Sequence, residues 1–79
     1  MTDLSVWLIH RTMKQGYHST LAARQTYESA TDYVREYMSH RTKHKWEICT
    51  RRAGVGPLAW RQLGEDCEEL ELEYIDVPV

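Results

Sequence analysis

Three residues near the middle of the chain, His40, His44 and Cys49, are of types that bind transition metals. The two histidines are four positions apart and would share one face of a continuous helix. However, no second cysteine lies nearby, and zinc sites normally show paired ligands at close spacing. Two cysteines in all are also too few to suggest a disulfide framework. We therefore expect no metal site, and we interpret the two histidines as residues flanking a solvated helix end.

Catalytic residue types are present without a catalytic pattern. Gly54 and Gly56 lack the spacing of a phosphate-binding loop and the Lys and Ser or Thr that would follow it. His10 could pair with Asp76 for acid–base chemistry if their strands are neighbours, but a single histidine on a strand is usually solvated or structural. A body this small also has difficulty enclosing a pocket of roughly a few hundred Å³. We expect no enzymatic activity and no cofactor.

The charged side chains separate into a basic part and an acidic part. All ten Lys and Arg residues lie before position 62, whereas seven of the twelve acids lie between positions 65 and 76 with no base among them. Residues 1–64, with ten bases and five acids, carry +5, and residues 65–79 carry −7. The overall charge of −2 hides these two opposite poles.

The acidic part has two possible roles. In the first, Glu71 and Glu73 face Lys45 or Arg51 across a sheet, where each opposite-charge pair contributes about 0.2–1 kcal/mol. In the second, the acids form a docking surface for a basic partner. The candidate docking acids are Glu65, Asp66, Glu68, Glu69, Glu71, Glu73 and Asp76.

Basic residues gathered around a tryptophan suggest an alternative, a small nucleic-acid-binding module. Its candidate residues are Arg41, Lys43, Lys45, Trp46, Arg51 and Arg52. Such bases could bind phosphates while the indole stacks on a nucleobase. The acidic part would repel a polyanion, and the sequence pI is about 6.0, so direct nucleic-acid binding is not the main expectation.

A helix over residues 29–41 is the element that these groups would surround. Ser29 can cap it, with Asp32 three positions later in the place of a capping-box acid. One apolar stripe then follows at helical spacing, made of Ala30, Tyr33, Val34, Tyr37 and Met38. His40 and Arg41 close the last turn, where positive charge suits the helix dipole.

Short strands are expected on either side of this helix, over residues 4–11, 44–51, 58–63 and 70–77. Residues 19–28 fit a strand or an extension of the helix, and we favour the strand. The predicted fold is a single α+β domain over residues 1–79, an antiparallel sheet of four or five short strands with one helix packed on one face. The element order is ββαβββ, or βαβββ if residues 19–28 are helical.

The first strand is apolar on both faces, since Leu4, Val6 and Leu8 alternate with Trp7 and Ile9. One helix can cover one face only, and the pattern leaves open which set lies beneath it. From the other strands, the inner face would draw on Trp46, Ile48, Leu72 and Tyr74. An uncovered apolar face usually marks an interface, so we expect a homodimer or a larger partner to contact Trp7 or Ile9.

In its size, its strand–helix order and the acidic strand LELEYIDV over residues 70–77, the chain resembles small accessory proteins of phages and mobile elements, including anti-CRISPR inhibitors. That resemblance implies steric or charge-mimicking contact in place of catalysis. The acids would imitate nucleic-acid phosphates against a basic groove of a defence complex. Alternatively, the apolar sheet face would bind and the acids would steer.

We therefore expect a small non-catalytic binding or inhibitory protein whose partner is a larger protein or ribonucleoprotein with a basic groove. A nucleic-acid-binding module and a purely structural homodimer are the alternatives. The N-terminal residues lack the features of a signal peptide, and no apolar run approaches the roughly 20 residues of a membrane span. The expected location is the cytoplasm, which would be that of a host cell if a phage encodes the chain.

Overall fold

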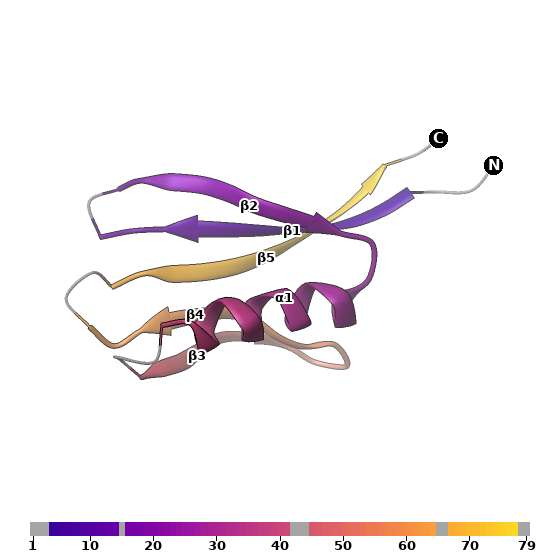
Figure 1. Ribbon diagram of the computed structural model, residues 1–79. Coiled ribbons are helices and arrows are strands. Elements are labelled where there is room, and N and C mark those ends of the chain that lie inside the picture. The colour runs from indigo at the N-terminus through magenta and orange to yellow at the C-terminus, as the bar shows by residue number, and fades with distance from the viewer. Residues whose placement is uncertain (1–3, 15, 42–44, 65–66, 78–79) are drawn as a thin grey trace.

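The computed structural model describes residues 4–14, 16–41, 45–64 and 67–77, which form one helix and a five-stranded sheet (Figure 1). The α+β fold and the order ββαβββ are confirmed. The elements are β1 (Leu4–Thr12), β2 (His18–Arg24), α1 (Tyr27–Ser39), β3 (Trp46–Arg52), β4 (Gly56–Gln62) and β5 (Glu69–Val77). Within these residues, no helix has the length and apolar character that crossing a membrane requires.

The strands follow the order β2-β1-β5-β4-β3 across the sheet, and every neighbouring pair is antiparallel. The last strand of the chain is therefore the central one, with β1 on one side and β4 on the other (Figure 1). This arrangement places the most acidic segment of the sequence in the middle of the sheet.

The ambiguous segment after the first turn is a strand, as favoured from the sequence. It ends at Arg24, and two bent residues lead into the helix. A register shift between Ile9 and His10 interrupts its pairing with β1. The strand ends earlier than the span 19–28 suggests, because Thr26 serves as the N-cap of the helix.

The N-cap of the helix lies three residues earlier than predicted. Thr26 has the extended backbone of an N-cap (φ −125°, ψ 153°), and its side chain accepts a hydrogen bond of 3.0 Å from the backbone N–H of Ser29. Ser29 is thus inside the first turn, and the prediction that it caps the helix is wrong. The helix also ends at Ser39, with His40 as C-cap and Arg41 beyond it, so the last turn contains no basic residue.

The core lies between α1 and one face of the sheet. From the helix, Ala30 and Val34 are fully buried, which confirms the apolar stripe. The buried residues that meet them come from three neighbouring strands and are Trp7, Ile9, Trp60, Leu70 and Leu72.

The placement of the first strand corrects one expectation. Trp7 is 9% exposed and Ile9 is fully buried, both against the helix side of the sheet. The prediction that they lie on an uncovered face is therefore wrong. The alternate residues Val6 and Leu8 occupy the opposite face and are half-buried.

Two other residues expected on the inner face are more open than predicted. Ile48 is 40% exposed because its strand, β3, forms an edge of the sheet. Tyr74 is 45% exposed, although its ring contacts that of Trp7 with the centroids 4.9 Å apart. Trp46 is half-buried and packs against the core.

Candidate protein-binding surface

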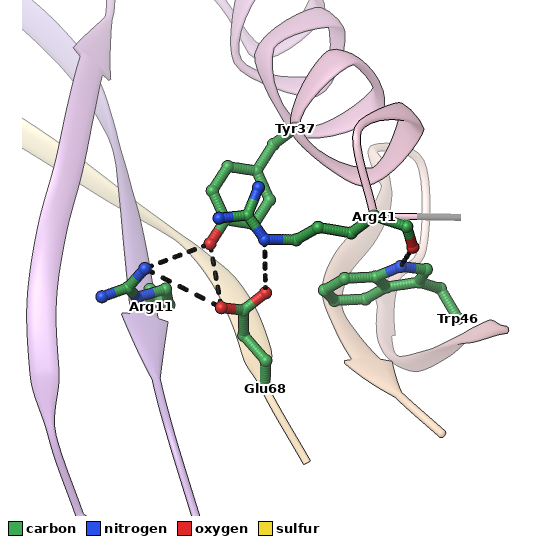
Figure 2. A network of polar contacts seen from close by, with 5 residues as sticks. All are labelled: Arg11, Tyr37, Arg41, Trp46 and Glu68. Carbon is green, nitrogen blue, oxygen red and sulfur yellow. Dashed lines mark hydrogen bonds and ion pairs between the residues drawn. The ribbon is translucent and has the colours of Figure 1, made fainter. Parts of the chain in front are cut away.

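A buried carboxylate directly before β5 joins the helix to the sheet (Figure 2). Glu68 is 5% exposed, and its Oε2 accepts a 2.9 Å hydrogen bond from the hydroxyl of Tyr37. The guanidinium of Arg11 approaches the same oxygen at 3.8 Å, and Nε of Arg41 lies 3.3 Å from Oε1. Two cations and one phenol therefore surround a single buried acid.

The two arginines also contact the ring and the hydroxyl of Tyr37. The guanidinium carbon of Arg41 lies 3.8 Å from the ring centroid, a cation–π contact, and Arg11 donates a 3.3 Å hydrogen bond to the hydroxyl. Burial raises the pKa of Tyr37, while the hydrogen bond from Arg11 opposes that shift. That hydrogen bond also raises the pKa of Arg11. Glu68 thus serves to hold the fold together, which removes it from the candidate docking acids.

Three acids of β5 lie on the open face of the sheet. Leu70 and Leu72 are buried against the core, so the alternating residues Glu69, Glu71 and Glu73 point to the opposite face. We call these three residues the acidic stripe. They follow one another along the central strand, on the face that α1 does not cover.

Internal partners contact two of the three acids of the stripe. Nε2 of His10 lies 3.1 Å from Oε1 of Glu73, and Nε of Arg61 lies 3.6 Å from Oε2 of Glu69. Arg61 is shared with Glu47, at 3.9 Å. Glu71 is exposed and has no ion-pair partner among the described residues. The stripe therefore keeps a net negative charge.

These pairs replace the ones expected from the sequence. Arg51 belongs to β3 and Lys45 directly precedes it. The strand β4 separates β3 from β5. Glu71 and Glu73 therefore cannot face them across neighbouring strands, and that pairing is wrong. The pair of His10 and Asp76 that was considered for acid–base chemistry does not form, because Asp76 lies opposite Ser5 at the other end of β1.

A small histidine cluster borders the acidic stripe and was not foreseen. The rings of His10 and His18 stack with their centroids 5.2 Å apart. His10 bonds to Thr20 at 2.9 Å through Nδ1, and His18 bonds to Thr12 at 3.1 Å. No sequence pattern links these residues, since their contact depends on the pairing register of β1 with β2.

The remaining candidate acids do not extend the stripe. Asp76 is exposed, but it lies at the far end of β5 and shares the face of Tyr74, not that of Glu73. Glu65 and Asp66 lie outside the described residues. On the face of the stripe, Glu73 is followed instead by Ile75, next to Val6 on β1.

The basic candidates for nucleic-acid binding are divided between two locations. Arg41 is occupied by Glu68 and Tyr37, and its carbonyl accepts a 3.3 Å hydrogen bond from the indole of Trp46. Both residues therefore belong to the network around Glu68, which we call the inner network, and Trp46 is half-buried there. Lys43 lies outside the described residues. The exposed bases at or beside the β3 edge are Lys45, Arg51 and Arg52.

Other potential ligands remain separate. Cys49 and Cys67 are both free and exposed. Among residues 4–14, 16–41, 45–64 and 67–77, no group of three or more His, Cys, Asp or Glu side chains is arranged to hold a metal ion. Of the residues considered as metal ligands, His44 lies outside these ranges.

Comparisons with known proteins add no functional information. No protein-family model, curated protein or solved structure matches the chain.

Proposed function

We propose that the protein is a non-catalytic binding protein that docks on a basic surface of a larger protein or ribonucleoprotein through the open face of its sheet. The observation that carries this proposal is the acidic stripe, in which Glu69, Glu71 and Glu73 share one face of the central strand. Glu71 and Glu73 are exposed and Glu69 is half-buried, and acids in one row on a centrally paired strand present a defined charge pattern to a partner.

The spacing of the stripe makes its charges act together. Residues two apart on a strand are about 7 Å from one another, which is within the Debye length of about 8 Å at physiological salt. Arg61 is the one arginine or lysine that reaches the stripe among the described residues, and it is shared between Glu69 and Glu47. A basic partner would therefore experience the stripe as a continuous negative feature.

Apolar side chains beside the stripe supply a short-range contribution. Val6, Leu8 and Ile75 lie on the same face and are half-buried in the free protein. Protein interfaces commonly combine an apolar centre with a polar surround. In this arrangement the acids accelerate encounter with the partner, and burial of Val6, Leu8 and Ile75 stabilises the complex.

Two alternatives fit the geometry less well. A nucleic acid would meet repulsion from the stripe and would lack Arg41 and Trp46, which are held by the inner network. A homodimer formed through the open face would place one acidic stripe against another, and like charges brought together in this way oppose association.

Affinity capture with matched charge variants tests the proposal. The wild-type protein, the double variant Glu71→Lys/Glu73→Lys and the control Asp32→Lys/Glu36→Lys would each be incubated with a lysate of the source organism. The control makes the same charge change on exposed helix positions. Zero-length carbodiimide cross-linking, read by mass spectrometry, then identifies which carboxylates touch the lysines of the captured protein.

We expect one protein to be captured by the wild type and the control and lost with the stripe variant. Its cross-links should run from Glu71 or Glu73 to lysines gathered on one surface. Equal capture by all three proteins, or cross-links confined to the helix acids, would count against the proposal.

A further inference from the structure

The strand β3 has an open edge. Among the described strands its single neighbour is β4, and six of its seven residues are exposed. An open edge presents a row of unpaired backbone N–H and C=O groups that can pair with another extended chain. Figure 1 shows this strand below α1, at the border of the sheet.

Two backbone hydrogen bonds establish which backbone groups of β3 point outward. The N–H of Leu63 donates to the backbone carbonyl of Lys45 at 2.7 Å. The N–H of Gln62 points away from β3 and donates to the backbone carbonyl of Glu68 at 2.8 Å. Bonded and non-bonded pairs alternate in an antiparallel ladder. Trp46, opposite Gln62, is therefore in a non-bonded pair.

The same alternation continues along the strand. Glu47, opposite Arg61, directs its backbone groups toward β4, and Ile48, opposite Trp60, directs its groups to the open edge. The register shifts just beyond Ile48, so the regular part of the edge is centred on Trp46 and Ile48. These two residues offer two N–H and two C=O groups to an incoming strand.

An apolar groove runs beside this edge. It has a volume of about 330 Å³ and lies between α1 and the hairpin formed by β3 and β4. Its lining includes Tyr27, Arg35, Met38, Ile48, Val55 and Trp60. A cleft of this size lies at the lower end of the range for ligand sites, about 300–1,000 Å³, and has room for a large apolar side chain.

The edge and the groove belong to one site because Ile48 contributes to both. Its backbone faces the open edge, and its 40% exposed side chain lines the groove. In an added strand, side chains alternate between the two faces of the sheet. A residue placed beside Ile48 on the helix side would therefore direct its side chain into the groove.

The surroundings of the site are positively charged. Arg51 and Arg52 are exposed on β3, and Lys45 is exposed directly before it. The nearby acids already have basic neighbours, since Asp32 lies 3.5 Å from Arg35 and Glu47 lies 3.9 Å from Arg61. A segment with acidic residues flanking an apolar one would complement this charge.

From these observations we propose a second binding site: the β3 edge takes up an acidic, extended peptide segment of another protein as a sixth strand. The peptide's backbone pairs with Trp46 and Ile48, a large apolar side chain fills the groove, and flanking acids meet Arg51 and Arg52. This is the strand-addition mode of peptide recognition.

A second copy of the chain is a poorer occupant. Antiparallel pairing of two β3 strands about Ile48 would place Lys45 of each copy opposite Arg51 of the other. Like charges directly opposite one another in a sheet are destabilising. Charge therefore favours an acidic peptide over self-association at this edge.

Selection from a yeast-displayed library of random linear peptides, followed by backbone amide exchange, tests this site. We expect the enriched peptides to carry a large apolar residue flanked by Asp or Glu. With such a peptide at about ten times its Kd, exchange at Trp46 and Ile48 should slow about tenfold, and Glu47 should change little because it is already paired with β4.

Variants separate the contributions of backbone and charge. Ile48→Pro removes an N–H that faces away from β4, a position where an edge strand tolerates proline, and should abolish binding. Arg51→Glu should weaken binding about tenfold, equivalent to about 1.4 kcal/mol, while Lys14→Glu in the distant β1–β2 turn should not. If Ile48→Pro does not fold, the difference in peptide affinity between Arg51→Glu and Lys14→Glu still tests whether the peptide binds at β3.

Three results would overturn the proposal. They are failure to enrich any peptide, protection of amides elsewhere than on β3, and protection of Trp46 and Ile48 in the free protein through self-association. Equal effects of Arg51→Glu and Lys14→Glu would likewise show that the local charge does not recognise the peptide.

Discussion

The hydroxyl of Tyr37 donates to Oε2 of Glu68 at 2.9 Å, in a location where Glu68 is 5% exposed. The contact joins the C-terminal half of the helix to the residue that precedes the central strand (Figure 2). A carboxylate is costly to bury unless it is paired, and here Arg11 and Arg41 supply the opposite charge. The inner network thus fixes the end of the helix above the sheet.

Removal of this carboxylate should destabilise the protein. Glu68→Gln leaves Arg11 and Arg41 without their common counter-ion, and we expect the free energy of unfolding to fall by about 2 kcal/mol. Glu71→Gln, on the solvated stripe, should change it by less than about 0.5 kcal/mol. Urea denaturation of the two variants provides the measurement, and equal stability would show that Glu68 is not a structural acid.

Adjacent positions on the helix should respond very differently to an acid. Val34 is fully buried, so Val34→Asp places an unpaired charge in the core and should prevent folding. Arg35 has 76% of its side chain exposed, and Arg35→Asp should be tolerated. Circular dichroism melts distinguish the two, and a parent-like melt for Val34→Asp would mean that the helix register is wrong.

The cap at the start of the helix gives a local test of the structure against the sequence pattern. Thr26→Ala removes the acceptor for the N–H of Ser29 and should cost about 1 kcal/mol. Ser29→Ala should cost little, because Ser29 is a helical residue here and alanine favours helix. If thermal melts showed the larger loss for Ser29→Ala, the cap would be at Ser29.

Alkaline pH should destabilise the fold through two tyrosines. Burial raises the pKa of Tyr27 and of Tyr37 above the ordinary value of 10.0. A raised folded-state pKa contributes stability that is complete below pH 10 and is lost as pH rises through the folded-state value. The unfolding free energy should therefore decline above about pH 10, and less steeply in Tyr27→Phe. An unchanged slope in this variant would exclude Tyr27 as a source of the decline.

The sequence predicts the elements well because their periodic patterns are local. Alternation along β5 and the stripe containing Ala30 and Val34 are sufficient to indicate a strand and a helix. The cap was less predictable, since Thr26 and Ser29 are both good N-cap residues and only the bends after β2 select between them.

The strand order and the candidate site could not be predicted from the sequence. No local sequence pattern indicates that β5 lies between β1 and β4. Without that order, the ion-pair partners of Glu69 and Glu73 cannot be assigned. A first strand apolar on both faces likewise does not reveal that Ile9 faces the helix. Glu68 stands in an acidic run beside Glu69, and only the positions of distant arginines distinguish the buried acid from its half-buried neighbour.

The acidic stripe is proposed as the docking surface, and its charge should control the rate at which the partner associates. Once the partner is captured and purified, stopped-flow association at roughly 50 to 300 mM salt tests this directly, since the Debye length falls from about 14 to about 6 Å over that range. If the acidic stripe is the docking surface, association is rapid at low salt and slows steeply as salt is added.

The double variant Glu71→Lys/Glu73→Lys should associate far more slowly than the wild type and lose its acceleration at low salt, with dissociation and the melting temperature little changed. The control Asp32→Lys/Glu36→Lys should behave as the wild type. If the double variant instead associates at the wild-type rate at every salt concentration while its melting temperature falls, the acids of β5 serve the fold alone and the proposed docking surface is wrong.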